Sequence, residues 1–197
     1  MEKRAQKSEH GRWDACYSSS SEFPSAAEVL QQNPHLLPKQ GKALDLACGL
    51  GANVFLLASH GLQTSAWDIS PVAIEKLKVS AGEKGFDVDV QTRDVVARPP
   101  EPESLDVIVV HRFLDRKLFP TLINALKPEG LLYYQTFIKK KVSDSGPSNP
   151  DYRLDSNELL KLCAPLQILF YREEACVGDI TKGFRDMAML VGLKSAI

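Results

Sequence analysis

Residues 44–53, with the sequence LDLACGLGAN, decide the fold of this chain. The stretch begins as an apolar strand, turns through two glycines and leads into the apolar, helix-like segment 54–61. Gly49 and Gly51 permit a tight turn and a close approach of the backbone to a ligand. The helix that follows exposes free N–H groups at its first turn. Because ligands of open α/β sheets bind at the carboxyl ends of the strands, we expect a nucleotide-like ligand here.

Short apolar runs alternate with amphipathic stretches on both sides of this turn. Strands are predicted at residues 42–48, 63–69, 86–94, 105–111, 131–137, 166–175 and 185–194. Helices are predicted at residues 54–61, 71–85, 116–127 and 155–165, with a short one inside 26–37 that Pro34 ends. This alternation predicts a doubly wound α/β fold with a seven-stranded, mostly parallel sheet and helices on both faces. The last two strands have no helix between them and should pair antiparallel at one edge.

Composition narrows the class of protein. The chain has 197 residues and a net charge of −1, which predicts one domain over residues 1–197 and disfavours a nucleic-acid-coating protein. No apolar run approaches the ~20 residues of a membrane helix, and the N-terminus lacks the apolar core of a secretory signal. The four cysteines are neither paired as C-x-x-C nor spaced with histidines as metal ligands. We therefore expect reduced thiols, no metal site and a cytoplasmic protein.

Acidic residues follow three successive predicted strands. Asp45 lies in the first strand, where its carboxylate would repel a pyrophosphate but suits an ammonium or sulfonium group. The third glycine of a dinucleotide-binding G-x-G-x-x-G would fall at Val54, so that motif is incomplete. Asp68 could accept both hydroxyls of a ribose, and Asp94 could accept a hydrogen bond from an adenine amine. Each aspartate alone is often a turn or cap residue, but together they predict a cationic nucleoside ligand.

Several of these motifs occur together in one family. LDLACGLGAN, WDIS (67–70), RDV (93–95) and LKPEGLLYYQTF (126–137) resemble class I S-adenosylmethionine-dependent methyltransferases. A W-D-x-x-Y element at residues 13–17 and a G-P-x-N-P loop at 146–150 resemble the tellurite-resistance-type, small-molecule branch. The resemblance implies S-adenosylmethionine as cofactor, a Rossmann-like core over residues 42–194 and an N-terminal lid segment over residues 1–40.

The resemblance also implies roles for individual residues. Asp45 and the two glycines would hold the methionine moiety, Asp68 the ribose, and Ile69 would pack on the adenine. Tyr17 would lie over the site. The full set of implied donor-binding residues is Asp45, Ala47, Gly49, Gly51, Asn53, Asp68, Ile69, Asp94 and Val95.

The candidate catalytic residues are His111, Arg112 and Tyr17. His111 ends the fourth predicted strand and could serve as a base, although a strand-end histidine can also be a packing residue. Arg112, with Arg116 and Arg153, could surround an anionic acceptor, or these arginines could be solvated or ion-paired. The branch has R-x-L-H-R after an aromatic residue where this chain has HRFLDR (111–116). The arginines match that pattern, but the residues at 111 and 115 do not.

We expect methyl transfer to a small acceptor that is an anion, a thiol or a chalcogen. The length leaves no separate substrate domain, and the near-zero charge disfavours nucleic acid as a partner. Alternatives are an RNA or protein methyltransferase, a non-catalytic protein that binds S-adenosylmethionine and, more remotely, a nicotinamide oxidoreductase. The chain is expected to be a monomer or a homodimer without membrane contact.

Overall fold

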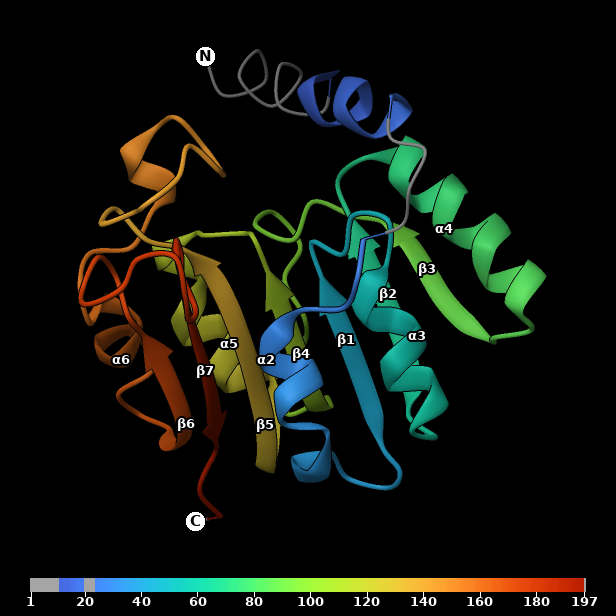
Figure 1. Cartoon of the computed structure of the whole chain (residues 1–197). Coiled ribbons are helices and arrows are strands. Elements are labelled where there is room, and N and C mark those ends of the chain that lie inside the picture. The colour runs from blue at the N-terminus through green and yellow to red at the C-terminus, as the bar shows by residue number, and fades with distance from the viewer. Residues whose placement is uncertain (1–10, 20–23, 197) are drawn as a thin grey trace.

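The computed structural model describes residues 11–19 and 24–196 (Figure 1). Part of the predicted N-terminal segment, at residues 1–10 and 20–23, lies outside the described residues. A single mixed sheet has the strand order β3-β2-β1-β4-β5-β7-β6. Its strands are β1 (Lys42–Leu46), β2 (Gln63–Asp68), β3 (Val88–Thr92), β4 (Leu105–His111), β5 (Leu126–Phe137), β6 (Gln167–Glu173) and β7 (Met187–Leu193).

The pairing of the strands confirms the predicted α/β fold. Strands β1 to β5 pair in parallel with one another, whereas β7 pairs antiparallel with both β5 and β6. The antiparallel strand β7 is inserted one place inside the edge, and β6 forms the edge itself. The chain order reverses between β1 and β4, which is where ligands bind in folds of this kind.

Helices cover both faces of the sheet, as predicted. The described helices are α2 (Glu28–Gln32), α3 (Ala52–Ser59), α4 (Pro71–Lys84), α5 (Phe119–Ala125) and α6 (Glu158–Leu162), and residues 11–18 are also helical. Short 3₁₀ turns are η1 (Pro34–Leu36), η2 (Arg116–Leu118) and η3 (Pro150–Tyr152). None of the helices in the described ranges has the length and apolar character needed to cross a bilayer.

Local signals explain where the helices begin and end. Ser70 is the N-cap of α4, accepting a hydrogen bond from the Ala73 amide at 3.2 Å, and Pro71 is the first helical residue, as predicted. The helix predicted over 116–127 is wrong at both ends: it starts as η2, and α5 stops at Ala125. The reason is pairing, because Leu126 already lies opposite Leu105 of β4. Asn157 is the N-cap residue of α6, and its side chain makes no capping hydrogen bond with the described residues.

Alternation along the strands assigns each side chain to one face. Ala43 of β1 and Val107 and Val109 of β4 pack with buried residues of α2 and α3. Leu44 of β1 and its β4 partner Ile108 pack instead with buried residues of α5 and α6. Asp45 is two residues after Ala43, so it lies on the face that α2 and α3 cover.

Candidate functional site

The turn after β1 has an unusual backbone. Ala47, Gly49 and Gly51 have φ angles of 55°, 52° and 77°, all in the left-handed region. The turn is held by a hydrogen bond from the Cys48 amide to the Trp67 carbonyl, at 3.0 Å. A Cβ at Gly51 would collide with the Leu77 side chain of α4. The sequence therefore needs glycine at position 51 for two reasons, the backbone angle and the packing of α4.

Asp45 is the most deeply buried carboxylate of the site. Its Oδ1 accepts a hydrogen bond from Asn53 Nδ2 at 3.0 Å, but its Oδ2 has no hydrogen-bond partner among the described residues. Burial raises the pKa of Asp45 to about 8, the Asn53 hydrogen bond opposes that rise and the nearby Asp68 adds to it. A buried carboxylate oxygen without a partner is costly, and a cationic group placed against it would remove that cost.

Asp68 ends β2 and supports the glycine turn. Its Oδ2 accepts a hydrogen bond from the Gly49 amide at 2.8 Å, and its Oδ1 accepts one from the Ser70 amide at 2.9 Å. Burial raises its pKa in spite of these amides. The sequence predicted Asp68 as a ligand-binding residue, and the structure adds that it joins the turn after β1 to the start of α4.

The structure also places the three other residues predicted after β2 and β3. Ile69 is half-buried beside Asp68, and Val95 is buried next to the core residues of β1 and β2. Asp94 Oδ1 accepts hydrogen bonds from the Val96 and Ala97 amides, at 3.0 and 3.1 Å. Asp94 therefore shapes the turn that follows β3.

Helical residues 11–18 lie above the carboxyl ends of the central strands (Figure 1). Two contacts fix this segment to α4: Ser70 Oγ donates to Asp14 Oδ1 at 2.5 Å, and Lys76 Nζ donates to the Tyr17 carbonyl at 2.7 Å. The Tyr17 hydroxyl is so near Gly49 that a Cβ there would lie 2.8 Å from it. Burial, followed by the charge of Asp68, raises the pKa of Tyr17, so the phenol keeps its proton.

His111 and Arg112 stand at the end of β4. Burial, with the Arg112 charge, lowers the pKa of His111 to about 4, so its imidazole is neutral at pH 7. Arg112 is exposed and has a φ of 58°, and its amide donates to the Gln135 carbonyl at 2.9 Å. Its guanidinium carbon lies 5.9 Å from the centre of the Phe137 ring. Strained residues of this kind cluster at functional sites.

Comparison with known proteins agrees with this geometry. Residues 43–130 match the family model described as a methyltransferase domain. The match spans 88 of the 197 residues and confirms, over that segment, the resemblance expected from the sequence. A Bacillus subtilis (strain 168) protein that carries the name methyltransferase YqeM is 26% identical over 57% of this chain. The match covers 49% of that relative, so the chain spans about half its length.

Solved structures share the fold of the methyltransferase domain. TehB from Haemophilus influenzae aligns with a TM-score of 0.71 at 19% identity, over 93% of this chain and 67% of TehB. A SAM-dependent methyltransferase from Aquifex aeolicus aligns with a TM-score of 0.65 at 16% identity, over 84% of this chain and 89% of that one. At these identities the likeness establishes the Rossmann-like methyltransferase fold.

Two of the three predicted acceptor arginines have structural partners among the described residues. Arg116 forms an ion pair with Glu158 at 2.6 Å and donates to the Asp151 and Arg153 carbonyls. Arg153 is buried and donates to three backbone carbonyls, those of Ile138, Ser145 and Pro147. Both guanidinium groups thus make protein contacts, as the alternative of an ion-paired arginine predicts for Arg116, and an acceptor role for them stays a prediction. Arg112 has no ion pair with any described residue.

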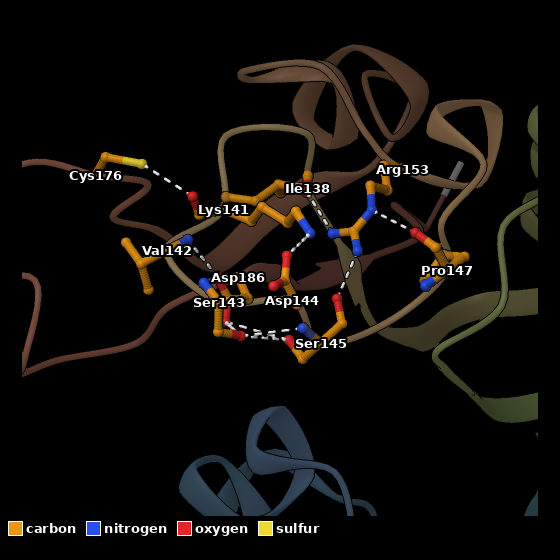
Figure 2. A network of polar contacts seen from close by, with 10 residues as sticks. All are labelled: Ile138, Lys141, Val142, Ser143, Asp144, Ser145, Pro147, Arg153, Cys176 and Asp186. Carbon is orange, nitrogen blue, oxygen red and sulfur yellow. Dashed lines mark hydrogen bonds and ion pairs between the residues drawn. The ribbon is translucent and has the colours of Figure 1, made fainter.

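Two buried polar residues have structural roles that no local sequence pattern predicts. Gln135 of β5 accepts a hydrogen bond on its Oε1 from the Val29 amide at 2.8 Å. Asp186 orders the loop after β5 (Figure 2). Its partners are 41 to 44 residues away along the chain, so no local pattern signals its role.

Proposed function

We propose that the chain is an S-adenosylmethionine-dependent methyltransferase that acts on a small acceptor, either an anion or a thiol or other soft chalcogen. The observation that supports the donor is Asp45 at the carboxyl end of β1, whose buried Oδ2 has no hydrogen-bond partner in the part of the chain that the structure describes. An ammonium group, such as that of a methionine moiety, is the natural complement of this oxygen. The methyltransferase domain found over residues 43–130 includes this turn.

The remaining donor contacts follow from the positions of the side chains. Ala47, Gly49 and Gly51 let the backbone pass close to the ligand. Asp68 has spare acceptor capacity on both oxygens and would receive the ribose hydroxyls. Ile69, Asp94 and Val95, at the ends of β2 and β3, would line the adenine.

When bound, S-adenosylmethionine supplies a methyl group on a sulfonium sulfur. The protein's task is then alignment and exclusion of water, since well-oriented reactants can gain ~7–11 kcal/mol. Tyr17, which keeps its proton and lies against Gly49, would cover the donor and donate a hydrogen bond. Within the N-terminal segment, residues 11–19 would therefore serve as the lid over the core, whereas α2 packs on a face of the sheet.

The acceptor class follows from the groups at the end of β4. A His111 imidazole with a pKa of about 4 is a weak base at pH 7, so it cannot readily activate a hydroxyl or an amine. A thiolate or an oxyanion already has the electron pair that the methyl group needs. Arg112, which has no ion-pair partner among the described residues, would attract such an anion.

A methyl-transfer assay with a panel of acceptors tests the proposal. We expect transfer to thiols or to selenium and tellurium oxyanions, and none to neutral alcohols or amines. Arg112→Gln should raise KM for the anionic acceptors with little change in kcat. Transfer only to alcohols or amines, or an Arg112→Gln variant with unchanged KM for every acceptor, would contradict the acceptor class.

A further inference from the structure

Asn53 connects two parts of the chain that are distant in sequence. It is buried near the start of α3, where its Nδ2 donates to Asp45 Oδ1 at 3.0 Å. Its Oδ1 accepts a hydrogen bond from the Ala27 amide at 2.8 Å. Ala27 is the N-cap residue of α2 and has no side-chain cap of its own. One amide side chain therefore contacts both the site carboxylate and the helix that packs beside it.

The chemistry of these partners fixes the orientation of the Asn53 amide. The Ala27 backbone N–H can only donate, so it requires the amide oxygen. The Asp45 carboxylate, when ionised, can only accept, so it requires the NH₂ group. A flipped amide would place oxygen against the carboxylate and NH₂ against N–H, losing both hydrogen bonds.

Because both ends of Asn53 are occupied, we infer that it does not contact the donor directly but acts through Asp45. We propose that Asn53 is a positioning residue that holds Asp45 with Oδ2 toward the donor ammonium while it anchors the start of α2. This inference rests on the proposed donor site. Its consequence is that charge recognition at Asp45 and the attachment of the N-terminal region are energetically coupled.

The surroundings of Asp45 make this hydrogen bond important. The other titratable groups that face Asp45 are Asp68 at the end of β2, Cys48 in the turn and Tyr17 from above. None of them is a cation, and all three become negative when ionised beside an already buried carboxylate. The Asn53 NH₂ group is therefore the donor within the described residues that favours the charged form of Asp45.

Gln135 provides a matched control. Its Oε1 anchors the same helix through the Val29 amide at 2.8 Å, but it makes no contact with Asp45. A Gln135→Met variant thus weakens the attachment of α2 and leaves the site carboxylate untouched. Any effect shared by the Asn53 and Gln135 variants reports on the helix, and any effect confined to Asn53 reports on Asp45.

The experiment compares Asn53→Asp, Asn53→Ala and Gln135→Met with wild-type protein. Asn53→Asp keeps an acceptor for the Ala27 amide but cannot donate to Asp45 when ionised, whereas Asn53→Ala loses both hydrogen bonds. Three readouts are taken: hydrogen exchange of the Ala27 amide, the carboxyl titration of Asp45 by NMR, and affinity for S-adenosylhomocysteine by calorimetry. The first two need no ligand.

We expect Ala27 to remain protected in Asn53→Asp and to exchange faster in Asn53→Ala. Both variants should titrate Asp45 at higher pH and bind S-adenosylhomocysteine at least about tenfold more weakly at pH 7. Gln135→Met should leave the Asp45 titration unchanged. An Asp45 titration that is unmoved in both Asn53 variants would overturn the inference.

Failure of the proposed function would look different. Wild-type protein that does not bind S-adenosylhomocysteine would contradict the donor assignment itself. The Asp45 titration and the Ala27 exchange would still decide whether Asn53 positions the carboxylate.

Discussion

At the scale of single residues, the site contains groups whose burial or backbone conformation costs free energy of folding. Asp45 is buried with one oxygen unpartnered, and Ala47 adopts a backbone conformation that suits glycine. Arg112 has the same kind of positive φ at the end of β4. Such costs are tolerated where a ligand or a reaction needs the geometry. They also predict measurable effects of small substitutions.

The raised pKa of Asp45 makes a pH-dependent contribution to stability. Its pKa rises from 3.8 to about 8 on folding, so the folded state binds the proton more tightly. Stability from this group is therefore fully present below about pH 4 and is lost as the pH rises toward 8. Between pH 5 and 8, wild-type protein should lose more unfolding free energy than Asp45→Asn, by a difference on the order of a few kcal/mol. Urea unfolding at both pH values measures this, and parallel losses would contradict it.

Ala47 offers a test of backbone strain. Its φ of 55° costs an L-residue about 1–2 kcal/mol, whereas glycine would lose only about 0.5–1 kcal/mol of extra chain entropy. We expect Ala47→Gly to raise the free energy of unfolding by roughly 0.5–1 kcal/mol. The control is Ala58→Gly inside α3, which should lower it by about 1 kcal/mol. Chemical denaturation of both variants checks the sign, and a destabilised Ala47→Gly would refute the strain.

At the scale of elements, the loop between β5 and α6 is held by two side chains (Figure 2). Asp186 accepts hydrogen bonds from the Val142 and Ser143 amides at 2.6 and 3.1 Å, and from the Ser143 and Ser145 hydroxyls. Arg153 donates to backbone carbonyls on the other side of the loop. Its guanidinium carbon lies 5.5 Å from the centre of the Phe137 ring, the same ring that Arg112 faces. The ordered loop therefore contacts, through Arg153, the same aromatic ring as Arg112, the residue proposed to attract the acceptor.

Asp186→Asn tests how much this order depends on the carboxylate. Burial opposes ionisation of Asp186, but its hydrogen bonds outweigh that cost and hold its pKa below the usual value. The substitution should lower the unfolding free energy by about 2 kcal/mol and speed proteolysis within residues 139–147. The loss should shrink as the pH falls below about 4, because wild-type Asp186 then becomes protonated.

The matched control lies in the same loop. Asp144 pairs with Lys141 at 3.0 Å, but its side chain is fully exposed. Asp144→Asn should therefore leave both stability and proteolysis unchanged. Equal effects of the two substitutions would show that the loop does not depend on Asp186.

Much of the element pattern could be predicted from the sequence because it rests on local signals. The apolar run 105–111 is β4 with the same bounds, and Ser70 and Pro71 begin α4 as expected. The helix before β5 could not be bounded, since its end is set by pairing between Leu105 and Leu126. The structural roles of Arg153 and Asp186 depend on contacts that only the folded chain brings together.

At the scale of the whole molecule, the topology gathers the site from separate segments. Strands β1, β2, β3 and β4 end at one edge of the sheet, and residues 11–18 lie above that edge (Figure 1). Asp45, Asp68 and Arg112 therefore lie at the same edge of the sheet although 67 residues separate the first from the last. This gathering underlies the proposal of a cationic donor beside an anionic acceptor.

Calorimetric titration of the full chain with S-adenosylhomocysteine, at pH 7, tests that proposal most directly. The account predicts saturable binding of one molecule per chain, accompanied by proton release, because Asp45 must ionise to pair with the ligand ammonium. Proton release appears as a dependence of the measured heat on the ionisation enthalpy of the buffer, and Asp45→Asn should abolish it. Absence of binding by a folded sample would contradict the account.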